Sequence, residues 1–240
     1  MNQEPNPVIA MKKAPTVSYE RSRTALRAWL SGRGHHKALE AMALAERYHT
    51  GTRKGGDPEF SHHVAQAHIL VALVPYLREP ETAFIALFLH DTVEDYGTPQ
   101  DAAPLPAFTL EEVRKRFGER AEQAVDRLSK VVNGVKKNED LYFAQLAEDP
   151  TASIIKGTDR IHNHQTMHGA FTAKKRDSYL DETEHRILPA MKAARKNFPD
   201  QLPAYELLKI FLHSQMGLIR AMEPVPVAAE PDEGPAATLT

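Results

Sequence analysis

The sequence contains no cysteine among its 240 residues. This absence excludes a disulfide framework, a thiolate metal site and a cysteine nucleophile, so any metal ion has to be held by histidine and carboxylate side chains. The sequence also has no large excess of one charge, because 30 Lys and Arg residues and 32 Asp and Glu residues give a formal net charge of −2. We therefore expect no binding of nucleic acid through bulk positive charge.

Long hydrophobic runs are missing as well. The longest apolar stretches, residues 69–76 and 83–89, are far shorter than the roughly 20 residues that span a bilayer. The N-terminal residues 1–16 contain Asn, Glu, Pro and Lys but no apolar signal core. We therefore expect a cytoplasmic protein without a membrane partner.

Three segments carry many prolines and little periodicity. Residues 1–16 and 97–107 hold three prolines each, and residues 223–240 hold four prolines and four acidic residues without Lys or Arg. These patterns predict a flexible N-terminal segment over residues 1–20, one domain over residues 21–222 with a surface loop, and a disordered acidic tail from 223 onward.

Elsewhere the apolar residues recur at helical spacing, and no stretch alternates with period two. Thr109-Leu-Glu-Glu112 has the form of a capping box, and Gly118 predicts a helix end. Asn133-Gly134 lies between polar or mixed stretches and predicts a loop. The fold is therefore predicted to be all-α, with helices over residues 35–49, 61–77, 81–95, 110–117, 119–128, 141–147, 152–168, 177–197 and 202–222.

Four ionisable residues gather at the end of one predicted helix, in Leu89-His90-Asp91-Thr92-Val93-Glu94-Asp95. Three- and four-residue spacing places them on the same end of that helix, where uncompensated carboxylates would repel one another and raise each other's pKa. A bound divalent cation removes this repulsion. A solvated helix end with a capping Asp is the alternative interpretation.

Two further positions share this character and make a metal site the stronger interpretation. His62 starts a predicted helix after a glycine-rich loop, and Asp159 lies within the predicted helix over 152–168. Together with the His90-Asp91 pair they form a set of two neutral and two anionic ligands with room for water. Such a set suits Mn, Fe, Zn or Mg.

These residues and their flanking segments resemble the HD-domain metal-dependent phosphohydrolases and, more narrowly, the hydrolase domain of the RelA/SpoT family. Residues 53–62 are similar to its Arg-Lys-x-Gly-[Glu/Asp]-Pro-x-x-x-His segment, and residues 89–95 to its Leu-His-Asp-x-x-Glu-Asp motif. Residues 155–166 are similar to its Ile-Lys-x-x-Asp-Arg-x-His-Asn-x-x-Thr motif, and Phe117-Gly118 and Leu128-Ser129-Lys130 to its Phe-Gly and Thr-Lys landmarks. The resemblance implies an HD-type helical bundle with a metal site in its core.

The resemblance also implies roles for individual residues. The implied ligands of one divalent ion, expected to be Mn²⁺, are His62, His90, Asp91 and Asp159. Glu94 is the implied general base and Asp95 the second acidic residue that orients the attacking water. The implied substrate contacts are Arg53 on a purine, Lys54 on a polyphosphate, and Asn163 and Thr166 on a phosphate or ribose.

The chain departs from the family pattern at two positions close to the predicted site. His63 follows the ligand histidine where the family usually has proline, and Gly55 stands where serine is frequent. With its 240 residues the chain is expected to resemble the small stand-alone alarmone hydrolases, some of which belong to phages or toxin–antitoxin loci. The sequence leaves the oligomeric state open.

The leading hypothesis is an enzyme that removes pyrophosphate from the 3′ position of ppGpp or pppGpp in the stringent response. A second hypothesis is an HD phosphohydrolase that acts on dNTPs, NADPH or an adenine alarmone, since the same metal site serves all of these substrates. A third is a non-catalytic nucleotide-binding module, which would have no need of the Glu94–Asp95 pair.

Overall fold

The computed structural model describes residues 18–99 and 105–222 and confirms the all-α prediction. The predicted tail, most of the predicted N-terminal segment and residues 100–104 of the predicted surface loop lie outside the described residues. The elements, in chain order, are α1 (Tyr19–Gly32), α2 (His36–Tyr48), α3 (Ser61–Leu73), a 3₁₀ turn η1 (Val74–Tyr76), α4 (Pro80–Tyr96), α5 (Leu110–Phe117), α6 (Glu119–Leu128), β1 (Val131–Val132), β2 (Val135–Lys136), α7 (Glu139–Ala147), α8 (Pro150–Met167), α9 (Ala173–Glu182), a π turn η2 (Thr183–Ile187), α10 (Leu188–Asn197), a 3₁₀ turn η3 (Pro199–Gln201) and α11 (Leu202–Met222). No helix within the described ranges is long and apolar enough to cross a bilayer.

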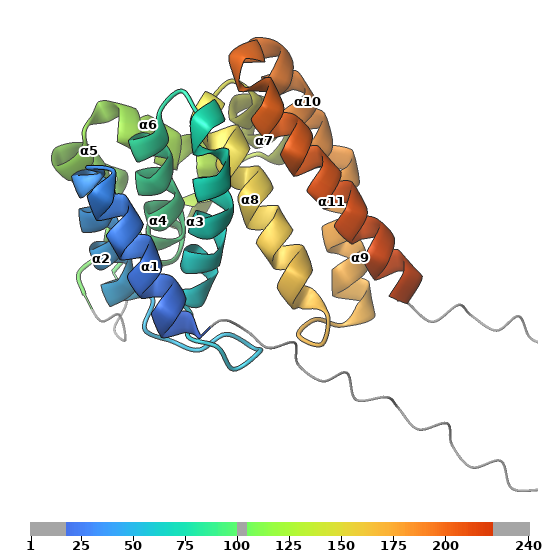
Figure 1. Cartoon of the computed structure of the whole chain (residues 1–240), viewed down its shortest axis with the longest axis horizontal. Helices are drawn as coiled ribbons and strands as arrows, with labels where there is room; N and C mark the ends of the chain where they lie inside the picture. Colours follow the sequence, from blue (N-terminus) through green and yellow to red (C-terminus); the bar gives the residue numbers. More distant parts are fainter. Residues whose placement is uncertain (1–17, 100–104, 223–240) are drawn as a thin grey trace, which may run out of the picture.

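Two central helices, α4 and α8, carry the core of the bundle. Residues 83–90 of α4 are all buried, and so are residues 151–162 of α8. α4 packs against α2, α6 and α8, while α8 also packs against α3 and α11. Figure 1 shows α8 between α3 on one side and α11 on the other. Because these stretches of the two helices are buried on all sides, the polar residues within them are held inside the protein, where each needs a partner.

The predicted helix over 177–197 is interrupted in the structure. α9 ends at Glu182, and a π turn leads into α10, with the Leu188 N–H bonded to the Thr183 carbonyl five residues earlier. Pro189 explains the interruption, since its ring would clash with the carbonyl of the residue four positions before it in a regular α-helix. The wider π turn relieves this clash and changes the direction of the chain.

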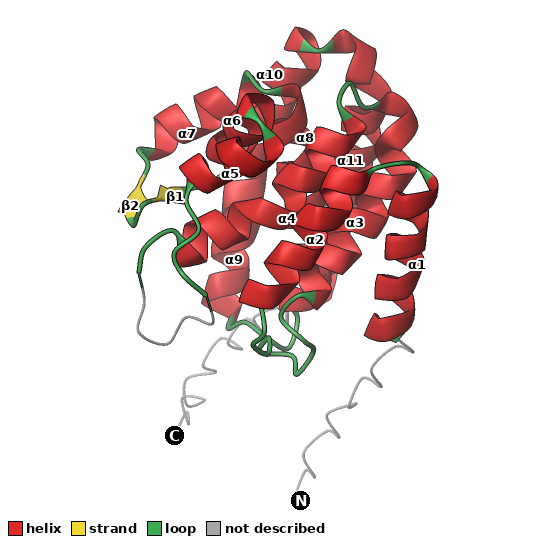
Figure 2. Cartoon of the chain, turned by 90° about the vertical axis from the view of Figure 1, so that its left-hand side faces the viewer, coloured by secondary structure: helices red, strands yellow, loops and turns green. Residues whose placement is uncertain are grey.

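Three smaller differences concern turns and helix ends. Asn133-Gly134, predicted as a loop, is the two-residue turn of a small β1–β2 hairpin at the edge of the molecule (Figure 2), and both residues have positive φ, as such tight turns require. The predicted helix from Ser61 becomes a 3₁₀ turn at Val74, where Pro75 supplies no N–H. Thr109 is the N-cap of α5, but within the described residues its side chain makes no capping hydrogen bond.

Close packing of α8 on α11 depends on Gly157. A Cβ at this position would lie 2.9 Å from Leu208 Cδ1, and Leu208 is fully buried. Gly157→Ala should therefore lower the free energy of unfolding by about 1–2 kcal/mol, because overpacking outweighs the gain of about 1 kcal/mol in helix propensity. Urea denaturation measures this change. Gly217→Ala on α11 is the control, since its Cβ would meet nothing within 4 Å and should not destabilise the protein; equal stability of the two variants would contradict the prediction.

Candidate metal centre

Side chains from several elements converge on a cavity of about 430 Å³. They come from the end of α2 and the loop after it, from α3, from the end of α4, from the segment after α6, from α8 and from α9. Nearly all of them are charged or are histidines. The lining residues are His49, Arg53, Glu59, His62, His63, Asp91, Glu94, Asp95, Lys130, Lys156, Asp159, Arg160, Asn163, Tyr179 and Glu182.

The four predicted metal ligands lie next to one another in the structure. His62 comes from the first turn of α3, His90 and Asp91 from the end of α4, and Asp159 from the middle of α8. His62 Nε2 is 3.1 Å from Asp159 Oδ1 and 4.0 Å from Asp91 Oδ2, and His90 Nε2 is 2.9 Å from Asp91 Oδ1. Three helices far apart in sequence thus bring two imidazoles and two carboxylates together.

The chemistry of this donor set fits a divalent cation. His90 Nδ1 is 2.9 Å from the Leu87 carbonyl, so its N–H donates there and leaves Nε2 as the ligand atom. His62 has Nδ1 2.6 Å from His162 Nδ1 and keeps Nε2 toward the carboxylates. The amide nitrogen of the buried Gln66 contacts this Nε2, while its Oε1 has no hydrogen-bond partner among the described residues. A cation between His62 Nε2 and the carboxylates of Asp91 and Asp159 would bind the lone pairs that these groups direct at one another.

The electrostatics of the site follow from charge pairs in a buried environment. Burial opposes protonation of His90, yet Asp91, with Asp159 and Glu94 nearby, raises its pKa to about 9. Burial likewise disfavours the charged form of Asp159, but Lys156, whose Nζ lies 2.8 Å from Oδ2, and His62 hold the pKa of this carboxyl well below its usual range. The two carboxylates predicted as ligands, Asp91 and Asp159, therefore stay ionised at neutral pH.

Glu94 and Asp95 both line the cavity, on the turn of α4 that follows Asp91. The Lys130 backbone N–H donates to Glu94 Oε1 and fixes its position. Burial and the nearby Asp91 raise the pKa of Glu94, and the same two causes raise the pKa of Asp95 to about 6. Raised values bring a carboxylate closer to the pKa suited to general base catalysis.

The structure separates the four predicted substrate residues into two pairs. Arg53 and Asn163 line the cavity, and Asn163 Nδ2 donates to Asp159 Oδ1 at 2.8 Å. Lys54 and Thr166 are not among the lining residues. Lys54 Nζ lies 6.0 Å from the Phe171 ring centroid, and the Thr166 hydroxyl donates to the His162 carbonyl of its own helix.

Three basic residues that are not among the predicted substrate contacts also line the cavity: Lys130, Lys156 and Arg160. Lys130 and Arg160 both pair with Glu182 and join α8 to α9 and to the segment after α6. The sequence offered a signal for each of them. Lys156 and Arg160 lie close to Asp159 along the chain, and Lys130 belongs to the Leu128-Ser129-Lys130 landmark.

His164, two residues after His162 on α8, is buried although it does not line the cavity. It is 2% exposed, and its Nε2 lies 3.0 Å from Thr183 Oγ1 of the π turn. The π turn, which the sequence pattern did not predict, is the element that covers this face of α8.

Comparison with known proteins identifies relatives that match about two thirds of this chain. No family model matches the chain. The chain is 31% identical over 163 residues to a probable GTP pyrophosphokinase of Mycobacterium leprae. This match covers 65% of the chain and 17% of the relative. The chain is also 31% identical over 149 residues to a guanosine-3′,5′-bis(diphosphate) 3′-pyrophosphohydrolase of Aquifex aeolicus. This match covers 60% of the chain and 19% of the relative.

The chain is similar to proteins of the RelA/SpoT family. A third relative, 32% identical over 160 residues and covering 65% of this chain and 18% of its own length, is the bifunctional (p)ppGpp synthase/hydrolase RelA of Mycobacterium tuberculosis. The chain thus spans less than a fifth of the length of these curated relatives. The names of these relatives include both synthesis and hydrolysis of (p)ppGpp.

Proposed function

We propose that this chain hydrolyses the 3′-pyrophosphate of ppGpp or pppGpp and releases GDP or GTP plus pyrophosphate. The observation that carries the proposal is the acidic pair Glu94–Asp95 in the same cavity as the His62, Asp91 and Asp159 side chains. Hydrolysis requires a base for water, and this pair offers one. The similarity to relatives named as 3′-pyrophosphohydrolases supports the same reaction.

A divalent ion, proposed to be Mn²⁺, would be held by the His62, His90, Asp91 and Asp159 side chains. When bound, it supplies positive charge that favours deprotonation of a nearby water and balances the charge of the departing pyrophosphate. Asn163 holds the Asp159 carboxylate in place through its hydrogen bond, and Lys156 balances the charge on the other oxygen.

The chain's own residues would then carry out the proton transfer. Glu94 accepts a proton from water, and Asp95 orients that water toward the phosphorus attached to the ribose 3′-oxygen. The bond between this phosphorus and the 3′-oxygen breaks, the water oxygen stays on the pyrophosphate, and the 3′-oxygen takes up a proton to become a hydroxyl. Arg53 at the cavity wall would stack on the purine, and Lys130 and Arg160 would face the phosphates.

Turnover of ppGpp by the purified full chain with Mn²⁺, resolved by anion-exchange chromatography, tests this proposal. We expect GDP and intact pyrophosphate, and loss of both on addition of EDTA. Unchanged ppGpp would overturn it. A parallel panel of dNTPs, NADPH and adenine alarmones tests the second hypothesis, and incubation with ATP and GTP tests pyrophosphate transfer, the activity after which other relatives are named. Binding without any product would instead support a nucleotide-binding module.

A further inference from the structure

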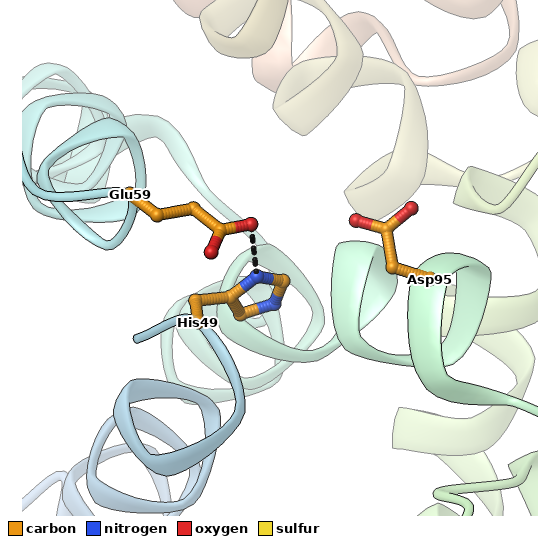
Figure 3. A group of neighbouring side chains, drawn as sticks. All are labelled: His49, Glu59 and Asp95. Atoms are coloured by element: carbon orange, nitrogen blue, oxygen red, sulfur yellow. Dashed lines mark hydrogen bonds and ion pairs between the residues drawn. The ribbon is translucent and has the colours of Figure 1, made fainter. Parts of the chain in front are cut away.

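A second group of ligand-type side chains lies on the same cavity, apart from the predicted metal ligands. We infer that His49, Glu59 and Asp95 form a second divalent-cation site beside the first. His49 follows α2, Glu59 belongs to the loop before α3, and Asp95 is near the end of α4. Figure 3 shows the Glu59 carboxylate and the His49 ring on one side, with Asp95 across from them.

The geometry of the three residues suits one ion. One ligand atom from each residue lies within 4.8 Å of the other two, and His49 Nδ1 is 3.2 Å from Glu59 Oε1. Ligands at about 2.1 Å from an ion, with bond angles near 90°, are about 3.0 Å apart. The His49–Glu59 spacing therefore allows an ion to replace the proton that the two atoms would otherwise share.

Neighbouring groups hold two of these ligands in place. Glu59 Oε2 accepts a hydrogen bond from the Gly51 N–H at 3.0 Å, which leaves Oε1 directed at His49. His49 is 3% exposed, and its Nε2 lies 3.1 Å from the Thr92 hydroxyl. A ligand set with fixed orientations loses little entropy when a metal ion binds.

A separate observation also indicates that a ligand binds here. His63 is 2% exposed, and neither of its ring nitrogens makes a hydrogen bond in the part of the chain that the structure describes. Its ring centroid lies 4.6 Å from that of His49, and its Nε2 lies 3.3 Å from Asp91 Oδ2 without forming a hydrogen bond to it.

A buried imidazole whose nitrogens have no hydrogen-bond partner lowers the stability of the folded state unless a bound group contacts those nitrogens. His63 lies between the two groups, in contact with His49 and close to Asp91 of the predicted first site. His63 also stands where the RelA/SpoT family, which the chain resembles, usually has proline. The histidine at this position is therefore particular to this chain and is not part of the ligand set that the resemblance implies. We therefore take His63 as a second, independent indication of a bound ligand, beside the three residues whose ligand atoms lie together.

The charge of the cavity is compatible with two ions. Its lining contains six carboxylates and four Lys or Arg side chains, which leaves an excess of two negative charges. One divalent ion balances this excess. The role of a second ion rests on the proposed function, since a substrate with two diphosphate groups brings additional negative charge that a second ion would balance.

Metal stoichiometry in the full-length protein tests the inference without any measurement of activity. Isothermal titration with Mn²⁺, together with metal analysis after gel filtration, should give two ions per chain. Glu59→Gln and His49→Gln should each lower the affinity for one ion at least tenfold and leave the other ion bound. Glu111→Gln on α5, an exposed change of the same type, should keep both ions. Circular dichroism checks that each variant is folded. If either Glu59→Gln or His49→Gln does not fold, the other variant still tests the site.

One ion in the wild-type chain, or two ions that remain in both folded variants, would overturn the second site. These results are distinguishable from a failure of the proposed function. Two bound ions without ppGpp turnover would refute the reaction and support the site, whereas turnover with a single bound ion would refute the site and support the reaction. Two Mn²⁺ ions as neighbours should also show exchange coupling in electron paramagnetic resonance, and Glu59→Gln should remove that signal.

Discussion

Glu94→Gln should lower kcat for ppGpp hydrolysis about 10²- to 10⁴-fold, the usual contribution of a general base. The amide keeps the size of the side chain and can still accept the hydrogen bond from the Lys130 N–H, so the cavity should keep its shape. It cannot accept a proton from water. Substrate affinity, measured as the Kd of ppGpp by isothermal titration in the presence of metal, should change less than about threefold because only the base is removed.

The exposed variant Glu111→Gln on α5 is the matched control, with the same chemical change far from the cavity lining. Its kcat should equal that of the wild type. A Glu94→Gln variant that turns over ppGpp at the normal rate would remove Glu94 from the mechanism and transfer the role of base to Asp95. Parallel loss of binding and rate would indicate a positioning role instead.

Asp159→Asn should have the second large effect, because it changes two interactions at once. The substitution removes one of the two carboxylates predicted to bind the first ion, so metal affinity should fall at least 100-fold. It also leaves the Lys156 ammonium, 7% exposed, without its counter-ion. A buried pair that loses one partner costs about 3–5 kcal/mol, so the free energy of unfolding should fall by this amount.

The double variant Asp159→Asn with Lys156→Met separates the two effects. Methionine removes the unpaired charge while filling similar space, so stability should recover, whereas metal affinity should stay low. Urea denaturation reports the stability and isothermal titration with Mn²⁺ reports the affinity. If both single and double variants bound Mn²⁺ as the wild type does, Asp159 would not be a ligand. If the single variant kept its stability, the Lys156–Asp159 pair would not be needed for the fold.

Most of the fold was predictable from local patterns. Apolar residues at helical spacing predicted α2, α4, α6, α8 and α11 to within a few residues, since burial of one helix face imposes that spacing on the sequence. Helix α1 (Tyr19–Gly32) was absent from the predicted helices. The other errors lie where one or two residues change the hydrogen bonding of the backbone. Pro189 introduces the π turn, Pro75 ends α3 early, and Asn133-Gly134 makes a hairpin from flanks that have no β pattern.

The candidate site was predictable in part for a different reason. The His90-Asp91 and Glu94–Asp95 pairs belong to one helical turn, so sequence spacing alone places them together. Their meeting with His62 and Asp159 depends on α3, α4 and α8 packing around a shared centre, which no local pattern encodes. Their residue types and positions made them candidates, the resemblance implied their role as ligands, and that role remains a prediction.

The sequence by itself determined the helical class, the absence of thiolate chemistry and the position of the acidic residues along α4, because each depends on residue type and on short-range spacing. Only the tertiary structure placed Lys130, Lys156 and Arg160 on the cavity and buried His63 and His164. It also joined His49 and Glu59 to Asp95, across about 40 residues of chain. Such groupings depend on which helices pack together, and packing is a property of the whole chain.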